Sequence, residues 1–243
     1  MVIWVFAGGG ETEAGGLIKF LQKIFPHYVF RRYTPFDSTK KGAKPNKKST
    51  FGISNTSLIQ SIQKYLPLAC LKEKHKPDLI LVIDDLDCGN LNHQHQQFLD
   101  CIANIPKVEN IDRYIAFAAP EIEAWIIADW DHTLAKAEKF KARHERMRHW
   151  LSTEKKVPFD QPESFGEYDP DKKACKEKLS NLLIEASSQK IEDQGKQYKK
   201  SEDSPDLLLL IEKTILCQKC PIFRDFYYYL ENLKPLDNQD GRL

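Results

Sequence analysis

Three acidic residues, Asp84, Asp85 and Asp87, follow the apolar run Leu79 to Ile83. The run does not alternate with polar residues, which predicts a strand buried on both faces with the acids at its carboxyl end. In an extended segment the side chains of Asp85 and Asp87 point one way and that of Asp84 the other. Paired carboxylates suit Mg²⁺ or Mn²⁺, because both ions prefer oxygen ligands. The simpler alternative is an acidic turn, since Asp favours turns.

A glycine-rich turn follows the first apolar run, Val2 to Ala7, and leads into Glu11 and Glu13. Such a turn between a strand and a helix lets backbone N–H groups approach an anion. The Gly-Lys-Ser/Thr ending of a P-loop is absent, and Glu13 replaces the third glycine of a dinucleotide site. The two acids would repel phosphate unless a metal ion lay between them, or they complement the helix dipole.

A third acidic segment, Pro120 to Glu123, follows the strand expected over residues 113–119. Pro120 is suited to the first turn of a helix, on which Glu121 and Glu123 would not share a face. We therefore expect only one acid, Glu123, to face the ligand-binding edge of the sheet. That edge is where parallel strands end, which would bring Glu123 close to Asp85. Complementing the helix dipole is the alternative role.

A basic segment between residues 38 and 48 also contains Gly, Pro and Asn, so we expect a loop. Lysines without interleaved aromatic residues fit phosphate contacts better than base stacking, although a solvated loop explains them equally well. The candidate nucleic-acid contacts are Lys40, Lys41, Lys44, Lys47 and Lys48, with Lys199 and Lys200 from the C-terminal part.

Composition narrows the class of protein. The 243 residues carry a formal net charge of +1, so any basic surface must be local. No run of eighteen apolar residues exists, and no basic segment precedes the first strand, which predicts a cytoplasmic protein without a membrane partner.

Six irregularly spaced cysteines do not form a disulfide framework, so we expect reduced thiols. Zinc at the single Cys217-x-x-Cys220 pair would have to recruit a distant residue such as Cys175.

The remaining patterns predict an α/β core over residues 1–131 and a helical C-terminal lobe over residues 132–243, packed on the core. A further strand is expected from Tyr28 to Arg32. One helix is expected after the glycine-rich turn and ends near Phe25, and another begins near Ser54 with a kink or break at Pro67. Further helices are expected over about residues 93–105, 171–187, 206–216 and 221–233.

These segments, in their order, resemble a TOPRIM-type (topoisomerase–primase) domain. The resemblance is strongest to a TOPRIM-like prokaryotic family of unknown function (DUF4276-type), related to RloB-like and OLD-like defence nucleases. It implies an α/β fold with a TOPRIM/Rossmann-like, mostly parallel sheet sandwiched by helices. The segments that carry it are Phe6-Ala7-Gly8-Gly9-Gly10-Glu11, Ile83-Asp84-Asp85-Leu86-Asp87, the stretch Glu123 to Asp129, Tyr198-Lys199-Lys200, Cys220-Pro221-Ile222-Phe223 and Leu230.

One position departs from the TOPRIM pattern. A glutamate ordinarily ends the first strand of these domains, where it acts in proton transfer and helps organise the metal, but this chain has Ala7 there. Glu11 could supply the missing carboxylate if the turn folds back, with Glu13 as the second choice. Otherwise the site has lost an acid and binds without cutting.

The resemblance implies a metal-dependent phosphodiesterase, a nuclease acting on RNA or DNA as the effector of a prokaryotic anti-phage or CRISPR-type defence system. Asp85, Asp87 and Glu11 would hold Mg²⁺ or Mn²⁺, and Glu11 could instead transfer a proton. Glu123 would be an outer ligand or organise a water on the metal.

Two other functions stay open. One is a catalytically impaired TOPRIM subunit, nucleic-acid-binding or regulatory, that works with an ATPase partner protein. The other is a small-molecule phosphohydrolase, since a fold does not set its substrate. A second copy of the chain, in a homo-oligomer, is a further candidate partner.

Overall fold

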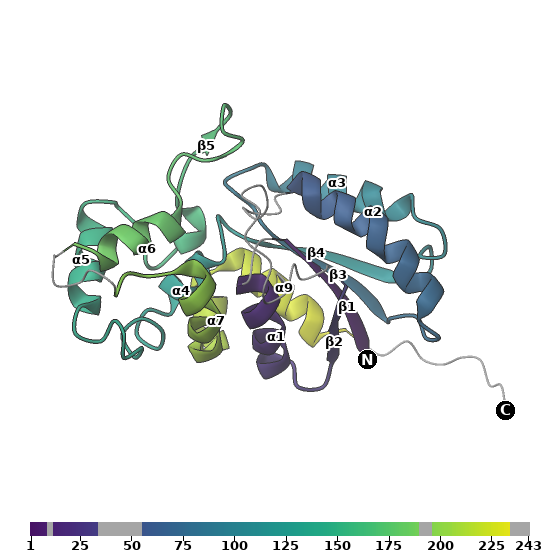
Figure 1. Ribbon diagram of the computed structural model, residues 1–243, viewed down its shortest axis with the longest axis horizontal. Helices are drawn as coiled ribbons and strands as arrows, with labels where there is room; N and C mark the ends of the chain where they lie inside the picture. The colour runs from purple at the N-terminus through teal and green to yellow at the C-terminus, as the bar shows by residue number, and fades with distance from the viewer. Residues whose placement is uncertain (9–11, 34–54, 190–195, 234–243) are drawn as a thin grey trace, which may run out of the picture.

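The computed structural model describes residues 1–8, 12–33, 55–189 and 196–233 (Figure 1). A four-stranded sheet of order β2-β1-β3-β4 forms its centre, and every pairing in it is parallel. The strands are β1 (Val2–Ala7), β2 (Val29–Arg32), β3 (Leu79–Asp85) and β4 (Asp112–Ala118). The expectation of an α/β fold with a parallel sheet flanked by helices is confirmed.

The register of the strands sets the position of the acids. Ala7 at the end of β1 is paired with Ile83 in β3, and Asp85 at the end of β3 is paired with Ala118 in β4. Parallel strands all end at one edge, so the segments after β1, β3 and β4 leave the sheet side by side. The strand residues Leu79 to Ile83 are all buried, as expected for a strand covered on both faces.

Helices cover both faces of the sheet. On one face, α2 (Asn55–Lys72) and α3 (Leu91–Ala103) pack over a cluster that includes Trp4, Phe6 and Val82. On the other face lie α9 (Pro221–Glu231) and α1 (Ile18–Ile24), which continues the π-helical turn η1 (Thr12–Leu17). Alternate residues of β1 thus enter different layers, because successive side chains of a strand point to opposite faces.

The C-terminal half shares its core with the sheet. A single hydrophobic cluster extends from Ile3 in β1 to Leu230 in α9 and includes the fully buried Trp125 and Phe223. The C-terminal half therefore packs against the sheet through one shared cluster. The elements in this half that have not yet been given are α4 (Glu123–Ala128), α5 (His144–Thr153), η2 (Pro162–Ser164), β5 (Tyr168–Asp169), β6 (Ala174–Cys175), α6 (Leu179–Ser187), α7 (Lys200–Leu210) and α8 (Lys213–Lys219).

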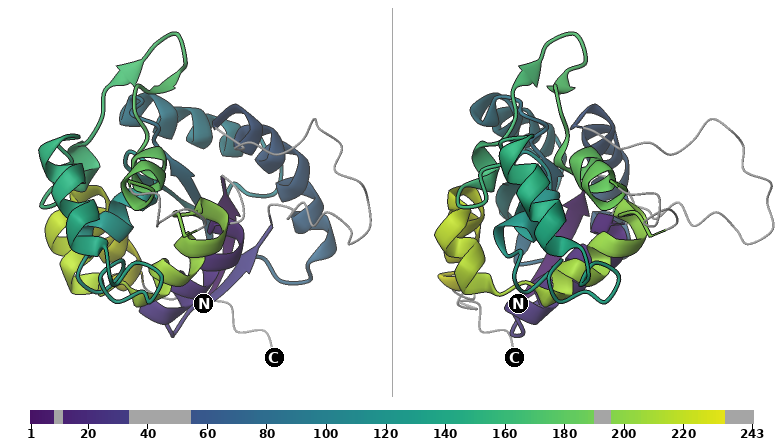
Figure 2. Two further views of the ribbon diagram at one scale, coloured as in Figure 1. Left: turned by 60° about the vertical axis from the view of Figure 1, so that its left-hand side comes forward. Right: turned by 90° about the vertical axis from the view of Figure 1, so that its left-hand side faces the viewer.

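Several expected boundaries are wrong, most of them in this half. The helix expected from residue 171 begins only at Leu179, because β5 and β6 form an antiparallel hairpin that projects from the helices (Figure 2). The helix expected over residues 206–216 is divided between α7 and α8. Pro67 lies inside α2 and does not end it. Pro120 does not begin a helix either, since α4 starts at Glu123.

Cysteine pairing also differs from expectation. A disulfide joins Cys88, after β3, to Cys175 in β6 across 87 residues. The prediction of reduced thiols is therefore wrong for these two residues, because the fold brings distant segments together in a way that cysteine spacing does not reveal. Cys217 and Cys220 are free thiols. No helix in the described part of the chain has the length and apolar character needed to cross a membrane.

Candidate acidic site at the carboxyl edge of the sheet

Asp85 ends β3 and points into the junction between the sheet and the helical half. Its Oδ1 accepts a hydrogen bond from the backbone N–H of Ile122 at 3.0 Å, and its side chain is 18 % exposed. The neighbouring Asp84 is buried, and its Oδ1 accepts the N–H of Asp85. Burial raises the pKa of Asp84 well above its ordinary value, and the charge of Asp85 adds to this effect.

Asp87 leaves the extended path of the strand. Its φ is 49°, in the left-handed region, and its N–H donates to the carbonyl of Pro120 at 2.8 Å. Its carboxylate forms an ion pair of 2.7 Å with Lys178, at the start of α6. The expectation that the chain stays extended from Asp85 to Asp87 is therefore wrong, because the backbone turns to follow the end of β4.

Three carboxylates converge on the ammonium of Lys200, the first residue of α7. Its Nζ lies 2.9 Å from Glu123 Oε2, 3.4 Å from Glu121 Oε2 and 3.6 Å from Asp85 Oδ2. Both glutamates reach the same point, so the expectation that only one of them faces the site is wrong. Glu121 precedes α4, and the helical spacing that would separate the two side chains does not apply.

Hydroxyl groups hold the two glutamates in place. Glu123 is fully buried, and its Oε1 accepts hydrogen bonds from the hydroxyls of Tyr198 at 3.0 Å and Ser204 at 3.1 Å. Glu121 accepts the N–H of Ser180 at 2.6 Å and its hydroxyl at 3.0 Å. A buried carboxylate needs such donors to replace lost water. The carboxylates are thus fixed by elements of the helical half.

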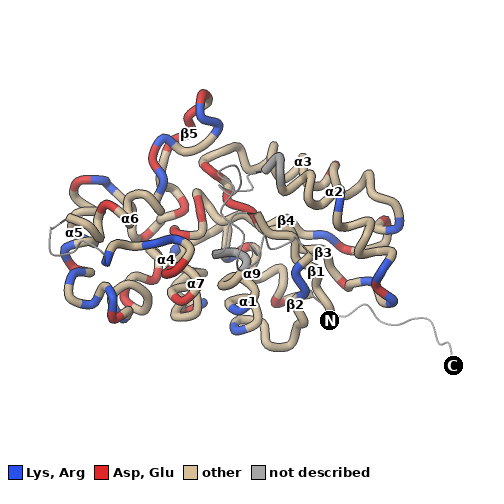
Figure 3. The backbone as a smooth tube through the Cα atoms, in the orientation of Figure 1, with Lys and Arg blue, Asp and Glu red and all other residues tan. Residues whose placement is uncertain are grey.

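The charge in the site is not balanced by the lysine. The three carboxylates and Lys200 sum to a formal charge of −2 when all are ionised. Burial raises the pKa of Asp85 to about 6, an effect that Lys200 opposes and Glu123 reinforces. Burial and then the charge of Glu123 raise the pKa of Glu121 to about 7. Figure 3 shows acidic segments meeting where the strands end and the helical half begins. The site has an excess of negative charge that attracts cations or protons.

A family model for a domain of unknown function, DUF4276, matches residues 10–231, which is most of the chain. The chain belongs to the DUF4276 family. No curated protein and no solved structure matched it. The match includes Asp85, both glutamates and Lys200, so the acidic site lies within the DUF4276 region.

The remaining residues that the sequence predicted for the site are not part of the acidic site as the structure describes it. Glu11 and the five lysines between residues 40 and 48 lie outside the described residues. Lys199 is exposed and forms an ion pair of 3.0 Å with Glu202. Sequence reasoning gave no site role to Glu121 or Tyr198. The only signal for Tyr198 was its place beside Lys200 in a segment that resembles the TOPRIM-like family.

The carboxylates of the acidic site suit a divalent cation, because every donor is a hard oxygen and the ion would balance the excess negative charge. No group of three or more His, Cys, Asp or Glu side chains in the described part of the chain is arranged as a metal site. The ammonium of Lys200 already lies among the three carboxylates. A metal ion held by Asp85, Glu121 and Glu123 would have to replace that ammonium.

Two surface hollows formed by described residues lie away from the acidic site. One of about 670 Å³ lies between β4 and α9 and is lined by residues such as Tyr114 and Tyr229. The other, of about 540 Å³, lies beside the β5–β6 hairpin and is lined by residues such as Phe165 and Lys176. Neither contains the converging acids. The acidic site is the stronger candidate for a functional site, because buried charge is costly to the fold and clusters at functional sites.

Proposed function

We propose that this chain is a metal-dependent phosphodiesterase, a nuclease that acts on RNA or DNA as the effector of a prokaryotic anti-phage or CRISPR-type defence system in the cytoplasm. The proposal takes the parallel sheet as a TOPRIM/Rossmann-like core with Mg²⁺ or Mn²⁺ as cofactor. One observation carries it. Asp85, Glu121 and Glu123 converge at the carboxyl edge of the sheet with more negative charge than Lys200 balances. Natural folds retain such clusters where a cation or substrate uses them.

The chain's own groups would divide the work at this site. When bound, Mg²⁺ or Mn²⁺ would stabilise negative charge on the scissile phosphate and lower the pKa of an attacking water. Tyr198 and Ser204 hold Glu123 in one orientation, and Ser180 does the same for Glu121. Such fixed carboxylates lower the reorganisation needed during reaction.

Lys200, once displaced from the carboxylates, would be placed to contact a phosphate oxygen beside them. Asp87 and Glu11 remain candidate ligands, with Glu11 as the alternative proton-transfer group. The lysines between residues 40 and 48, with Lys199, remain candidates for the phosphate backbone. These roles follow from residue type and position.

The test is cleavage of structured RNA, single-stranded DNA and duplex DNA with Mg²⁺ or Mn²⁺. Asp85→Asn should lower the rate at least a hundredfold while circular dichroism and thermal unfolding show an intact fold. The matched control is Asp225→Asn, an exposed acid in the hollow beside α9 that lies outside the acidic site. Cleavage by Asp85→Asn at the wild-type rate would remove this site from consideration.

A second function is favoured by the end of β1. Ala7 is buried there and provides no carboxylate, and Lys200 already neutralises part of the acidic site. A catalytically impaired TOPRIM subunit that binds nucleic acid and works with an ATPase partner would have these properties. It predicts binding to the same panel without cleavage, unchanged by Asp85→Asn, and cleavage or ATP turnover only when the partner is added.

A further inference from the structure

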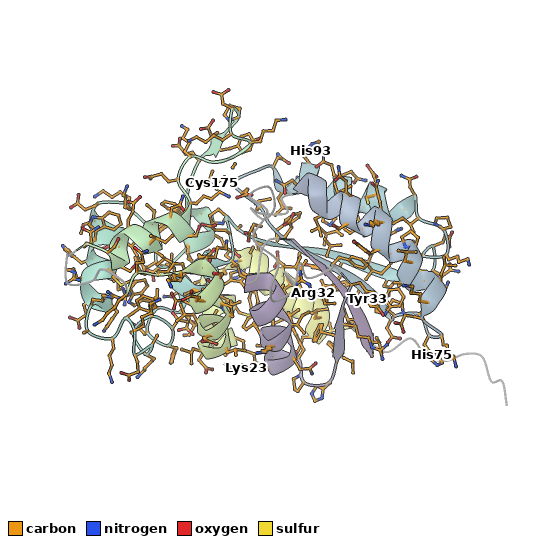
Figure 4. The ribbon with its side chains drawn as sticks, in the orientation of Figure 1. Lys23, Arg32, Tyr33, His75, His93 and Cys175 are labelled. Carbon is orange, nitrogen blue, oxygen red and sulfur yellow. A yellow bond between two sulfur atoms is a disulfide. The ribbon has the colours of Figure 1, made fainter. Side chains whose placement is uncertain are left out.

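The Cys88–Cys175 disulfide connects the loop that carries Asp87 to the β5–β6 hairpin. Cys88 directly follows Asp87, and Cys175 is the last residue of β6 at the base of the hairpin, as Figure 4 shows. The two half-cystines differ in exposure, because Cys88 is partly exposed and Cys175 is buried. Cys88 is thus the more exposed residue of the pair, with its sulfur 3.8 Å from the carbonyl oxygen of Phe165.

The same two segments are joined a second time. Lys178, three residues after Cys175, forms the 2.7 Å ion pair with Asp87. This pair is partly exposed, with 38 % of the Lys178 side chain and 22 % of the Asp87 side chain accessible. Exposed ion pairs are weak and screened by salt. The covalent bond is thus the stronger of the two connections that keep Asp87 beside Lys178.

The backbone of this loop needs external support. Asp87 and Cys88 have φ values of 49° and 59°, and residues with a side chain rarely adopt this region. The hairpin itself has a ladder of only two residue pairs. Its base packs closely on the disulfide, since a Cβ at Gly166 would lie 2.8 Å from the Cys88 sulfur. Removing the bond would therefore loosen both the hairpin and the Asp87 loop, which would keep the ion pair with Lys178 and the hydrogen bond from Asp87 to Pro120.

We propose that Cys88 and Cys175 form a reversible thiol–disulfide site, which in its oxidised state holds the carboxylate of Asp87 against Lys178. The reactant is a dithiol, either a small molecule or a reduced protein. One thiolate attacks the sulfur of Cys88, the more exposed residue of the pair, and releases the Cys175 thiolate, which takes a proton. The second thiol then attacks the mixed disulfide and releases Cys88, so two electrons pass to the protein and the dithiol becomes a disulfide.

The consequence for the acidic site rests on the proposed function. In the reduced protein only the ion pair with Lys178, among the described residues, connects Asp87 to the hairpin segment, so Asp87 can leave it and join Asp85 as a carboxylate ligand. The oxidised protein would then bind Mn²⁺ more weakly than the reduced protein. Reduction would act as an activating modification.

The first experiment uses the wild-type protein and mass spectrometry after alkylation. In protein oxidised with diamide and freed of the excess reagent, iodoacetamide should label neither Cys88 nor Cys175. Dithiothreitol should make Cys88 reactive, and renewed oxidation should reverse this. Free Cys88 and Cys175 thiols after oxidation would overturn the proposal, as would a disulfide that survives dithiothreitol in the folded protein.

The second experiment asks whether the bond controls the loop. Limited proteolysis should cut residues 166–178 at least threefold faster in the reduced protein, and hydrogen exchange at residues 86–90 should rise. The Cys88→Ser, Cys175→Ser variant should behave as reduced under both conditions, and the control Cys217→Ser should keep the wild-type response. Equal proteolysis and exchange in both states would overturn the proposal even if the disulfide forms.

Titration with Mn²⁺ by calorimetry distinguishes a failure of the thiol–disulfide proposal from a failure of the proposed metal-dependent function. At least threefold tighter binding in the reduced protein supports the proposed site, and equal binding in both states overturns it while leaving the metal-dependent function intact. Absence of Mn²⁺ binding in both states counts against the metal-dependent function, and the proteolysis and exchange results then decide the thiol–disulfide site alone.

Discussion

Replacing Glu121 by Gln tests the electrostatics of the acidic site directly. A carboxyl whose pKa is about 7 instead of the ordinary 4.5 binds its proton more tightly in the folded state. Its stabilising contribution is complete below pH 4.5 and is lost as the pH rises through 7. The ionised Glu121 therefore makes the wild-type fold less stable at pH 8 than at pH 5.

The structure sets the size of the effect. The difference between the two pKa values corresponds to about 3 kcal/mol at pH 8, at about 1.36 kcal/mol for each pH unit. Gln resembles the protonated acid but offers only one oxygen to the two donors of Ser180. Loss of one such hydrogen bond costs about 1 kcal/mol. We expect Glu121→Gln to be more stable than the wild type by about 1–2 kcal/mol at pH 8 and less stable by about 1 kcal/mol at pH 5.

Urea unfolding at both pH values, in the presence of EDTA and followed by tryptophan fluorescence, measures these differences. Glu138→Gln is the matched control, because the Glu138 side chain is 88 % exposed and its replacement should change neither value by more than about 0.5 kcal/mol. If Glu121→Gln is less stable than the wild type by the same amount at pH 5 and pH 8, Glu121 is ionised without cost and the electrostatic reasoning fails.

Lys200→Met removes the only ammonium that contacts all three carboxylates in the described part of the chain. The free energy of unfolding should therefore fall by about 1–3 kcal/mol at pH 8 and by less at pH 5, and Mn²⁺ should restore it. An equal loss at both pH values would contradict this prediction. Tyr198→Phe leaves Glu123 with one hydroxyl donor fewer and should cost about 1–2 kcal/mol in urea unfolding, compared with under about 0.5 kcal/mol for the exposed Tyr228→Phe. Phe223→Ala empties a fully buried position between aromatic rings. Calorimetry should show that the free energy of unfolding falls by about 3–5 kcal/mol. A loss of under about 1 kcal/mol would mean that the surrounding side chains fill the cavity. Replacing the five lysines of residues 40–48 by Gln should flatten the salt dependence of nucleic-acid binding by about one unit of slope for each true phosphate contact, and an unchanged slope would exclude them.

Local sequence patterns determined the frame of this protein. The apolar runs of β1, β3 and β4 predicted buried strands, and the three strands form a parallel sheet with buried residues on both faces. Because parallel strands end at one edge, the same patterns placed Asp85 and the segment of Glu121 and Glu123 near each other. Strand formation depends on residues that are adjacent in sequence, so these features could be predicted from the sequence alone.

Tertiary structure alone decided how the acids are used. Lys200 and Ser180 lie 79 and 59 residues from Glu121, and Cys175 lies 87 residues from Cys88. Hydrophobic periodicity reports which face of an element is buried but not which distant side chain meets it there. Whether Glu121 reaches the site depended on the short non-helical segment before α4, and whether Asp87 stays with Asp85 depended on the path of the chain over β4. Contacts between segments so far apart in sequence exist only once the whole chain is packed.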